Sequence, residues 1–163
     1  QVNGTEKGLL ELPWKCSLIY GLSAEGPYIA VSKDKDGIFY IKNKMIKGIG
    51  RYSMLLNNKK ERDGNIDYKR SIAISPDNMK FIVFQQDDNF ITINIVDAVD
   101  GTLRSITLNC SSNERNIKSI SQKWISDDLL LVNTHSKGWL INLKNKIKIY
   151  SWIEPNGSTI LES

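Results

Sequence analysis

The sequence predicts an all-β protein, a partial β-propeller built from consecutive antiparallel four-stranded sheets. Apolar residues occur in short runs of four to six, rich in Ile, Val, Phe and Tyr, and Gly, Pro, Asn and Asp separate these runs. Such punctuation is typical of strands and turns. The same two-strand unit also occurs three times along the chain. No window repeats apolar residues at helical spacing over three turns, so helices are not expected.

The first two units are predicted to be hairpins, each made of two apolar strands joined by a polar turn. Their strands are expected at residues 28–31 and 38–41, and at residues 81–84 and 90–95. In the second hairpin, Ile91, Ile93 and Ile95 fall on one side of a strand. Thr92 and Asn94 fall on the other side. This alternation with a period of two residues is typical of a half-buried sheet.

The third unit and the spacing of all three units set the predicted repeat length. Strands of the third unit are expected at residues 129–132, 139–143 and 147–150. The interval from Tyr28 to Phe81 is 53 residues, and the interval from Phe81 to Leu129 is 48 residues. Repeats of about 40 to 50 residues with four short strands each are typical of propeller blades. A polar insert at residues 57–67, predicted to be a surface loop, explains the longer first interval.

We therefore expect residues 1–163 to form a WD40-like architecture of about three blades and the start of a fourth. The blades are expected over residues 12–56, 68–109 and 115–150, and the next blade over residues 151–163. Propellers close with about four to eight blades, so an exposed strand edge is expected at each end. The chain also lacks an initiator Met. We expect a piece of a longer protein, or a dimer, and poor solubility or self-association of the piece alone.

The composition and the motifs predict no catalytic, cofactor-binding or metal site, and we expect that the protein is not an enzyme. The chain is 40% hydrophobic and 25% charged, which are ordinary globular values. Two cysteines, Cys16 and Cys110, and one histidine, His135, are too few for a disulfide framework, a zinc cluster or general-base chemistry. Turns are instead predicted at Asp87-Asp88, at Asp127-Asp128 and at Gly48-Ile49-Gly50.

The net charge of +4 raises the question of an anionic partner. Acidic residues interrupt the basic ones, so a solvated loop surface is the favoured interpretation and no nucleic-acid partner is expected. The alternative is an anionic surface contact, such as a membrane surface, made by Lys59, Lys60, Arg62, Lys69 and Arg70. No stretch approaches the roughly 18 uninterrupted apolar residues of a membrane span, so such a contact would be peripheral.

Several segments, taken in order, resemble the N-terminal propeller of a known family. They are Leu9-Leu10-Glu11-Leu12, Ser71-Ile72-Ala73-Ile74-Ser75, Asn116-Ile117, Lys123-Trp124-Ile125-Ser126, Leu129-Leu130-Leu131-Val132 and Tyr150-Ser151-Trp152-Ile153-Glu154-Pro155. In strand pattern and in a few aromatic and turn residues, the chain resembles the colon cancer-associated Mic protein family. That family is the metazoan regulatory subunit of the Mon–Ccz guanine nucleotide exchange complex. The insert at residues 57–67 departs from the family, and the chain ends before the family's remaining blades and helical C-terminal region.

The resemblance implies a non-catalytic scaffold without a cofactor. Its expected partner is the Mon–Ccz heterodimer, and its expected place is the cytoplasmic surface of late endosomes and lysosomes, where it would support Rab activation, endosome maturation and autophagy. Two alternatives stay open. A WD-like interaction module of another assembly would show the same blades. A ligand-binding or enzymatic propeller would need polar residues from several blades that converge on the central channel.

Overall fold

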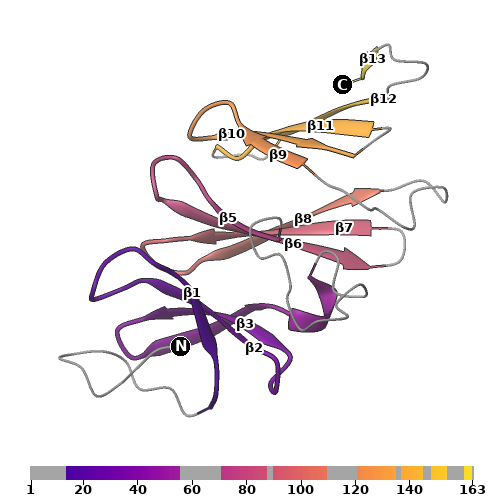
Figure 1. Ribbon diagram of the computed structural model, residues 1–163. Coiled ribbons are helices and arrows are strands. Elements are labelled where there is room, and N and C mark those ends of the chain that lie inside the picture. Colours follow the sequence, from indigo (N-terminus) through magenta and orange to yellow (C-terminus); the bar gives the residue numbers. More distant parts are fainter. Residues whose placement is uncertain are drawn as a thin grey trace.

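Three antiparallel β-sheets follow one another along the chain in the computed structural model of the protein (Figure 1). The structure describes residues 14–55, 71–87, 90–109, 121–134, 137–144, 148–153 and 160–162. Each sheet is a meander, in which every strand pairs with its neighbours in sequence. The predicted all-β class and the predicted antiparallel sheets are therefore confirmed.

The first sheet has the strand order β1-β2-β3-β4. Its strands are β1 (Ser17–Gly21), β2 (Tyr28–Ser32), β3 (Gly37–Lys42) and β4 (Met45–Gly50), and a single-turn 3-10 helix, η1 (Tyr52–Met54), follows. The turn predicted at Gly48 and Gly50 is wrong, because both glycines lie within β4. The register shifts beside them: Ile38 pairs with Gly50, and Phe39 pairs with Gly48. Glycine in a strand often marks such a bulge.

The second sheet has the order β5-β6-β7-β8. Its strands are β5 (Ile72–Ile74), β6 (Lys80–Asp87), β7 (Phe90–Asp97) and β8 (Leu103–Asn109). The predicted alternation in β7 is confirmed for Ile91, Ile93 and Ile95, which are all buried in one apolar cluster. Asn94, on the opposite face, is also buried. That face packs against the first sheet, and the Asn94 side-chain amide donates a hydrogen bond to the Ile49 carbonyl (2.7 Å).

The third sheet has five strands in the order β13-β12-β11-β10-β9. They are β9 (Ser121–Trp124), β10 (Leu129–Asn133), β11 (Lys137–Asn142), β12 (Lys148–Ile153) and β13 (Ile160–Glu162). The structure differs here from the expectation that a new unit begins at residue 151. β12 pairs with β11 from Lys148 to Ile153 without interruption, and β13 pairs with β12. The continuous pairing holds residues 151–153 and 160–162 in the third sheet.

The three sheets stack, and apolar side chains fill both contacts between them (Figure 1). One cluster joins the first sheet to the second and includes Tyr40 and Phe81. The other cluster joins the second sheet to the third and includes Phe84 and Trp139. Strand β6 contributes to both clusters because successive residues of a strand point to opposite faces. The second sheet is thus buried on both faces.

Candidate functional site

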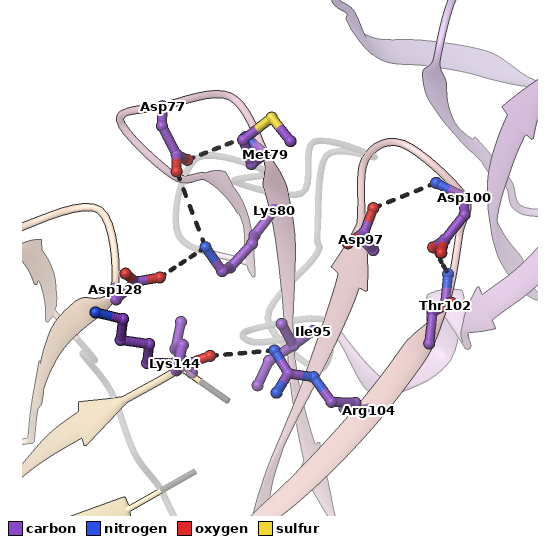
Figure 2. A pocket seen from close by; sticks show the side chains of 11 residues that line it. Asp77, Met79, Lys80, Ile95, Asp97, Asp100, Thr102, Arg104, Asp128 and Lys144 are labelled. Atoms are coloured by element: carbon purple, nitrogen blue, oxygen red, sulfur yellow. Dashed lines mark hydrogen bonds and ion pairs between the residues drawn. The ribbon is translucent and has the colours of Figure 1, made fainter. Parts of the chain in front are cut away.

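A cavity of about 610 Å³ lies between the second and third sheets, at the end where the strand-connecting turns of both sheets meet. Figure 2 shows its lining at close range. The lining comes from the β5–β6 turn, β6, β7, the β7–β8 turn, β8, the β9–β10 connection and the residues after β11. The residues are Asp77, Met79, Lys80, Ile95, Asp97, Asp100, Thr102, Arg104, Asp128, Leu143 and Lys144.

Asp77 organises the β5–β6 turn at one edge of the cavity. Its Oδ1 accepts hydrogen bonds from Ser75 Oγ (2.6 Å) and from the Met79 N–H (3.1 Å). Asn78 between them has a φ of 61°, in the left-handed region that Asn tolerates better than most residues. Burial opposes the ionisation of Asp77, but the hydrogen bonds from Ser75 and Met79 and the charge of Lys80 outweigh it and lower the pKa of this carboxyl. The carboxylate is therefore ionised at neutral pH.

Two further aspartates organise the β7–β8 turn at the opposite edge. Asp97 Oδ1 accepts hydrogen bonds from the N–H groups of Val99 (2.8 Å) and Asp100 (3.2 Å). Asp100 Oδ1 accepts one from the Thr102 N–H (2.8 Å), and this contact is the main cause of the lowered pKa of Asp100. Both carboxylates belong to short local networks that are typical of Asp in turns.

The first sheet holds the β7–β8 turn from the other side. Tyr40 Oη donates to the Ala98 carbonyl (2.8 Å), Lys42 Nζ donates to the Val99 carbonyl (2.6 Å), and Lys47 Nζ donates to the Gly101 carbonyl (2.8 Å). Burial, and then the negative charges of nearby aspartates, raise the pKa of Tyr40, so its hydroxyl keeps the proton that it donates. These bonds connect residues more than 50 positions apart in the sequence and fix the turn in place.

Polar contacts across the floor of the cavity connect the second sheet to the third. Lys80 Nζ lies 2.9 Å from Asp128 Oδ1 and 4.0 Å from Asp77 Oδ2. The Lys80 side chain is only 15% exposed, so its charge needs these partners. Arg104 Nη2 donates to the Leu143 carbonyl (3.2 Å), and the Leu143 N–H donates to the Asp128 carbonyl (2.7 Å). The charge of Lys80 is thus balanced by Asp77 and Asp128, which also line the cavity.

Opposite charges remain on the two sides of the cavity. Asp97 and Asp100 stand on one side, and the Arg104 guanidinium reaches toward the Leu143 carbonyl on the other side, where Lys144 and Asp128 also lie (Figure 2). Within the part of the chain that the structure describes, no carboxylate lies within 4.0 Å of the Arg104 or Lys144 side chain. The cavity can therefore hold a group that brings both a cation and an anion.

None of the residues of the sequence-based site prediction is among the residues that the structure describes. Lys59, Lys60, Arg62, Lys69 and Arg70 lie outside the described residues, as do His135, Cys110 and the insert at residues 57–67. Asp127 and Asp128 do lie in a turn, between β9 and β10, as predicted. However, Asp128 also pairs with Lys80, which the sequence did not indicate because the two residues belong to different sheets.

Among the described residues, no group of three or more His, Cys, Asp or Glu is arranged to hold a metal ion. The described ranges also contain no helix with the length and apolar character needed to cross a membrane.

Comparison with known proteins gives no relative of this chain. No protein-family model, no curated protein and no solved structure matches it.

Proposed function

We propose that the three sheets are consecutive blades of a WD40-like β-propeller and that the protein is a non-catalytic interaction scaffold. The observation that carries the proposal is the stacking of successive antiparallel meanders through two apolar contacts. Propeller blades are four-stranded sheets arranged in this way around an axis. The fifth strand of the third sheet, β13, is a local addition to this pattern.

The turns at the ends of the stacked sheets support a scaffold function. The turns at the cavity end are held by side chains from neighbouring sheets and by their own aspartates. Such turns keep one shape and can be recognised by a partner without an ordering penalty. The aspartates of the cavity and Lys80 are engaged in turn networks and an ion pair, which suits recognition better than proton transfer.

The partner that the family resemblance suggests is the Mon–Ccz guanine nucleotide exchange heterodimer. In this proposal the protein supports Rab activation from the cytoplasmic surface of late endosomes and lysosomes, and thereby endosome maturation and autophagy. The segments that carry the resemblance include Lys123-Trp124-Ile125-Ser126, which begins in β9, and Leu129-Leu130-Leu131-Val132, which lies in the neighbouring strand β10.

Affinity purification of the natural full-length protein from cells, followed by mass spectrometry, tests the partner. Enrichment of both Mon and Ccz subunits over a tag-only control is the expected result. Recovery of another stable complex without these subunits would contradict the Mon–Ccz assignment but would agree with a scaffold function. A structure of the same full-length protein by electron microscopy tests the architecture, and an open stack of sheets instead of a closed ring would contradict the propeller.

A further inference from the structure

Exposed apolar side chains gather at the end of the sheets where the cavity opens. In the described part of the chain, five large hydrophobic side chains are exposed by 42% to 54%. Four of them lie in or directly beside turns at this end: Met45, Met79, Val99 and Ile125. The fifth, Phe90, begins β7 at the opposite end of the second sheet. We call the four residues, together with the cavity, the turn surface.

The turn surface is continuous, because neighbouring turns touch one another. A Cβ placed on Gly101 would lie 3.4 Å from the Met45 methyl carbon, so Met45 packs beside the β7–β8 turn. The Ala98 N–H donates to the Met79 carbonyl (2.9 Å), which joins that turn to the β5–β6 turn. The ion pair between Lys80 and Asp128 then joins the β5–β6 turn to the β9–β10 connection, where Ile125 lies. All three sheets therefore contribute to one surface.

The charges of the turn surface complement those of a peptide that carries both a basic and an acidic residue. Asp97 and Asp100 offer carboxylates on one side of the cavity, and Arg104 and Lys144 offer cations on the other. Lys80, between them, is already paired. A ligand that matches both sides must carry a basic and an acidic group, and the exposed methionines favour apolar side chains beside them because thioethers adapt to varied shapes. A polypeptide segment supplies all three groups at once.

We propose that the turn surface binds an extended peptide segment of a partner protein. A basic side chain of the segment faces Asp97 and Asp100, an acidic side chain faces Arg104 and Lys144, and apolar side chains cover the exposed methionines. This inference rests on the proposed function as an interaction scaffold and names the surface and the kind of partner that the scaffold uses. The fixed turns lower the entropy lost on binding.

A peptide selection tests the surface directly. The full chain is immobilised and used to select from a random linear peptide library displayed on phage. The enriched peptides should combine basic, acidic and apolar residues. Synthetic copies are then titrated by fluorescence polarisation against four variants. Met79→Ser and Lys144→Glu change the turn surface. Phe90→Ser and Lys35→Glu are matched controls, because Phe90 and Met79 are both 44% exposed and Lys35 is an exposed lysine in the β2–β3 turn at the opposite end.

We expect Met79→Ser and Lys144→Glu each to weaken peptide binding by about fivefold or more, the size of effect that a loss of about 1 kcal/mol produces. The two controls should stay within about twofold of the unmodified protein. All four side chains lie at exposed or turn positions, so unfolding midpoints should stay close to that of the unmodified chain. A selection without enriched peptides, or peptides that bind Met79→Ser and Lys144→Glu as tightly as the unmodified chain, would overturn the proposal.

Affinity purification separates this proposal from the proposed function. The natural full-length protein carrying Met79→Ser and Lys144→Glu together should lose a complex that the unmodified protein recovers. Unchanged recovery would overturn the turn surface and leave the scaffold in place. Failure of the unmodified protein to recover any complex would contradict the scaffold, and the peptide titration then decides the turn surface by itself.

Discussion

Asp77 stands at the centre of the β5–β6 turn, where one carboxylate oxygen accepts hydrogen bonds from Ser75 Oγ and from the Met79 N–H. The same Ser75 Oγ accepts a hydrogen bond from the Lys80 N–H (3.0 Å). Ser75 is fully buried, so this network satisfies polar groups that water does not reach. At the scale of single residues, a carboxylate in such a turn contributes to stability through the backbone conformation that it holds.

Replacement of Asp77 by alanine should therefore destabilise the fold. We expect a loss of about 1–2 kcal/mol in the free energy of unfolding at neutral pH, because two hydrogen bonds to an ionised acceptor disappear and Ser75 loses a partner. Urea unfolding followed by tryptophan fluorescence measures it. Asp34→Ala is the matched control, since Asp34 is an exposed aspartate in the β2–β3 turn, and a change within about 0.5 kcal/mol is expected. Equal effects of the two substitutions would contradict the role of Asp77.

Asp36 gives the fold a dependence on pH. Burial opposes its ionisation, but hydrogen bonds from the Ser53 N–H (2.6 Å) and from the Arg51 guanidinium (2.8 Å) outweigh it and lower the pKa of Asp36. A native pKa below the unfolded value of about 3.9 contributes stability above that pH, and the contribution is lost as the pH falls through the native pKa. Arg51 is 66% exposed, so solvent screens its share.

We expect Asp36→Asn to lower the free energy of unfolding by about 1 kcal/mol at pH 7 and to lower it much less near pH 3. The neutral amide cannot reproduce the charge, and protonation of the unmodified carboxyl at low pH removes the same charge. Urea unfolding of both proteins at several pH values measures the difference. A difference that stays constant from pH 7 to pH 3 would show that the ionised carboxylate is not its cause.

At the scale of elements, the β7–β8 turn connects two strands of the second sheet and is also bound by side chains of the first sheet. Gly101 has a φ of 76°, and a Cβ at this position would lie 2.7 Å from Tyr40 Cε1. The Tyr40 ring cannot move aside, because it is fully buried and its hydroxyl is bonded to the Ala98 carbonyl. Both the backbone conformation and the close approach of the first sheet therefore require glycine at this position.

Gly101→Ala should lower the free energy of unfolding by about 2 kcal/mol or more, since strain at a positive φ and a steric clash add together. Gly48→Ala provides the matched control: Gly48 lies in β4, its φ is outside the positive region, and a Cβ there would meet nothing within 4 Å. That control should be neutral or stabilising by up to about 1 kcal/mol. Thermal unfolding of both variants gives the comparison, and a harmless Gly101→Ala would mean that the turn can rearrange.

At the scale of the whole molecule, the second sheet supports both of its neighbours. Phe81 and Phe84 lie in the same strand, β6, but Phe81 packs in the cluster shared with the first sheet and Phe84 packs in the cluster shared with the third. Stacked repeats gain stability from their own pairing and from nearest-neighbour contacts. Loss of one contact should therefore affect the two outer sheets unequally.

Hydrogen exchange of Phe81→Ala and Phe84→Ala tests this arrangement. Each substitution should destabilise by about 3–5 kcal/mol, because both rings are almost completely buried. Phe81→Ala should raise exchange most in β2 and β3, whereas Phe84→Ala should raise it most in β10 and β11. Identical exchange patterns in the two variants would indicate a single cooperative unit instead of separable contacts. Phe90→Ala, on a side chain that is 44% exposed, serves as the control with a small effect.

Much of the strand content could be read from local pattern. The hairpin of β2 and β3 and the hairpin of β6 and β7 lie where short apolar runs separated by turn residues predicted them, because strand formation and turn chemistry depend on neighbours in sequence. The turn predicted at Gly48 and Gly50 was wrong because glycine is common to turns and bulges, and only the pairing partner distinguishes them. The same limit applies to the new unit expected from residue 151. The pairing of β12 with β11 continues to Ile153, and the local sequence does not reveal this pairing.

The sequence by itself determined the all-β class, the antiparallel hairpins and the repeated order of strands, since these follow from the period of apolar residues and from turn residues a few positions apart. Only the tertiary structure decided which residues form the cavity. Lys80 meets Asp128, and Lys47 meets the Gly101 carbonyl, across about 50 residues of chain. Contacts of this kind depend on how the sheets stack, and apolar packing between the sheets sets that stacking without leaving a local signal in the sequence.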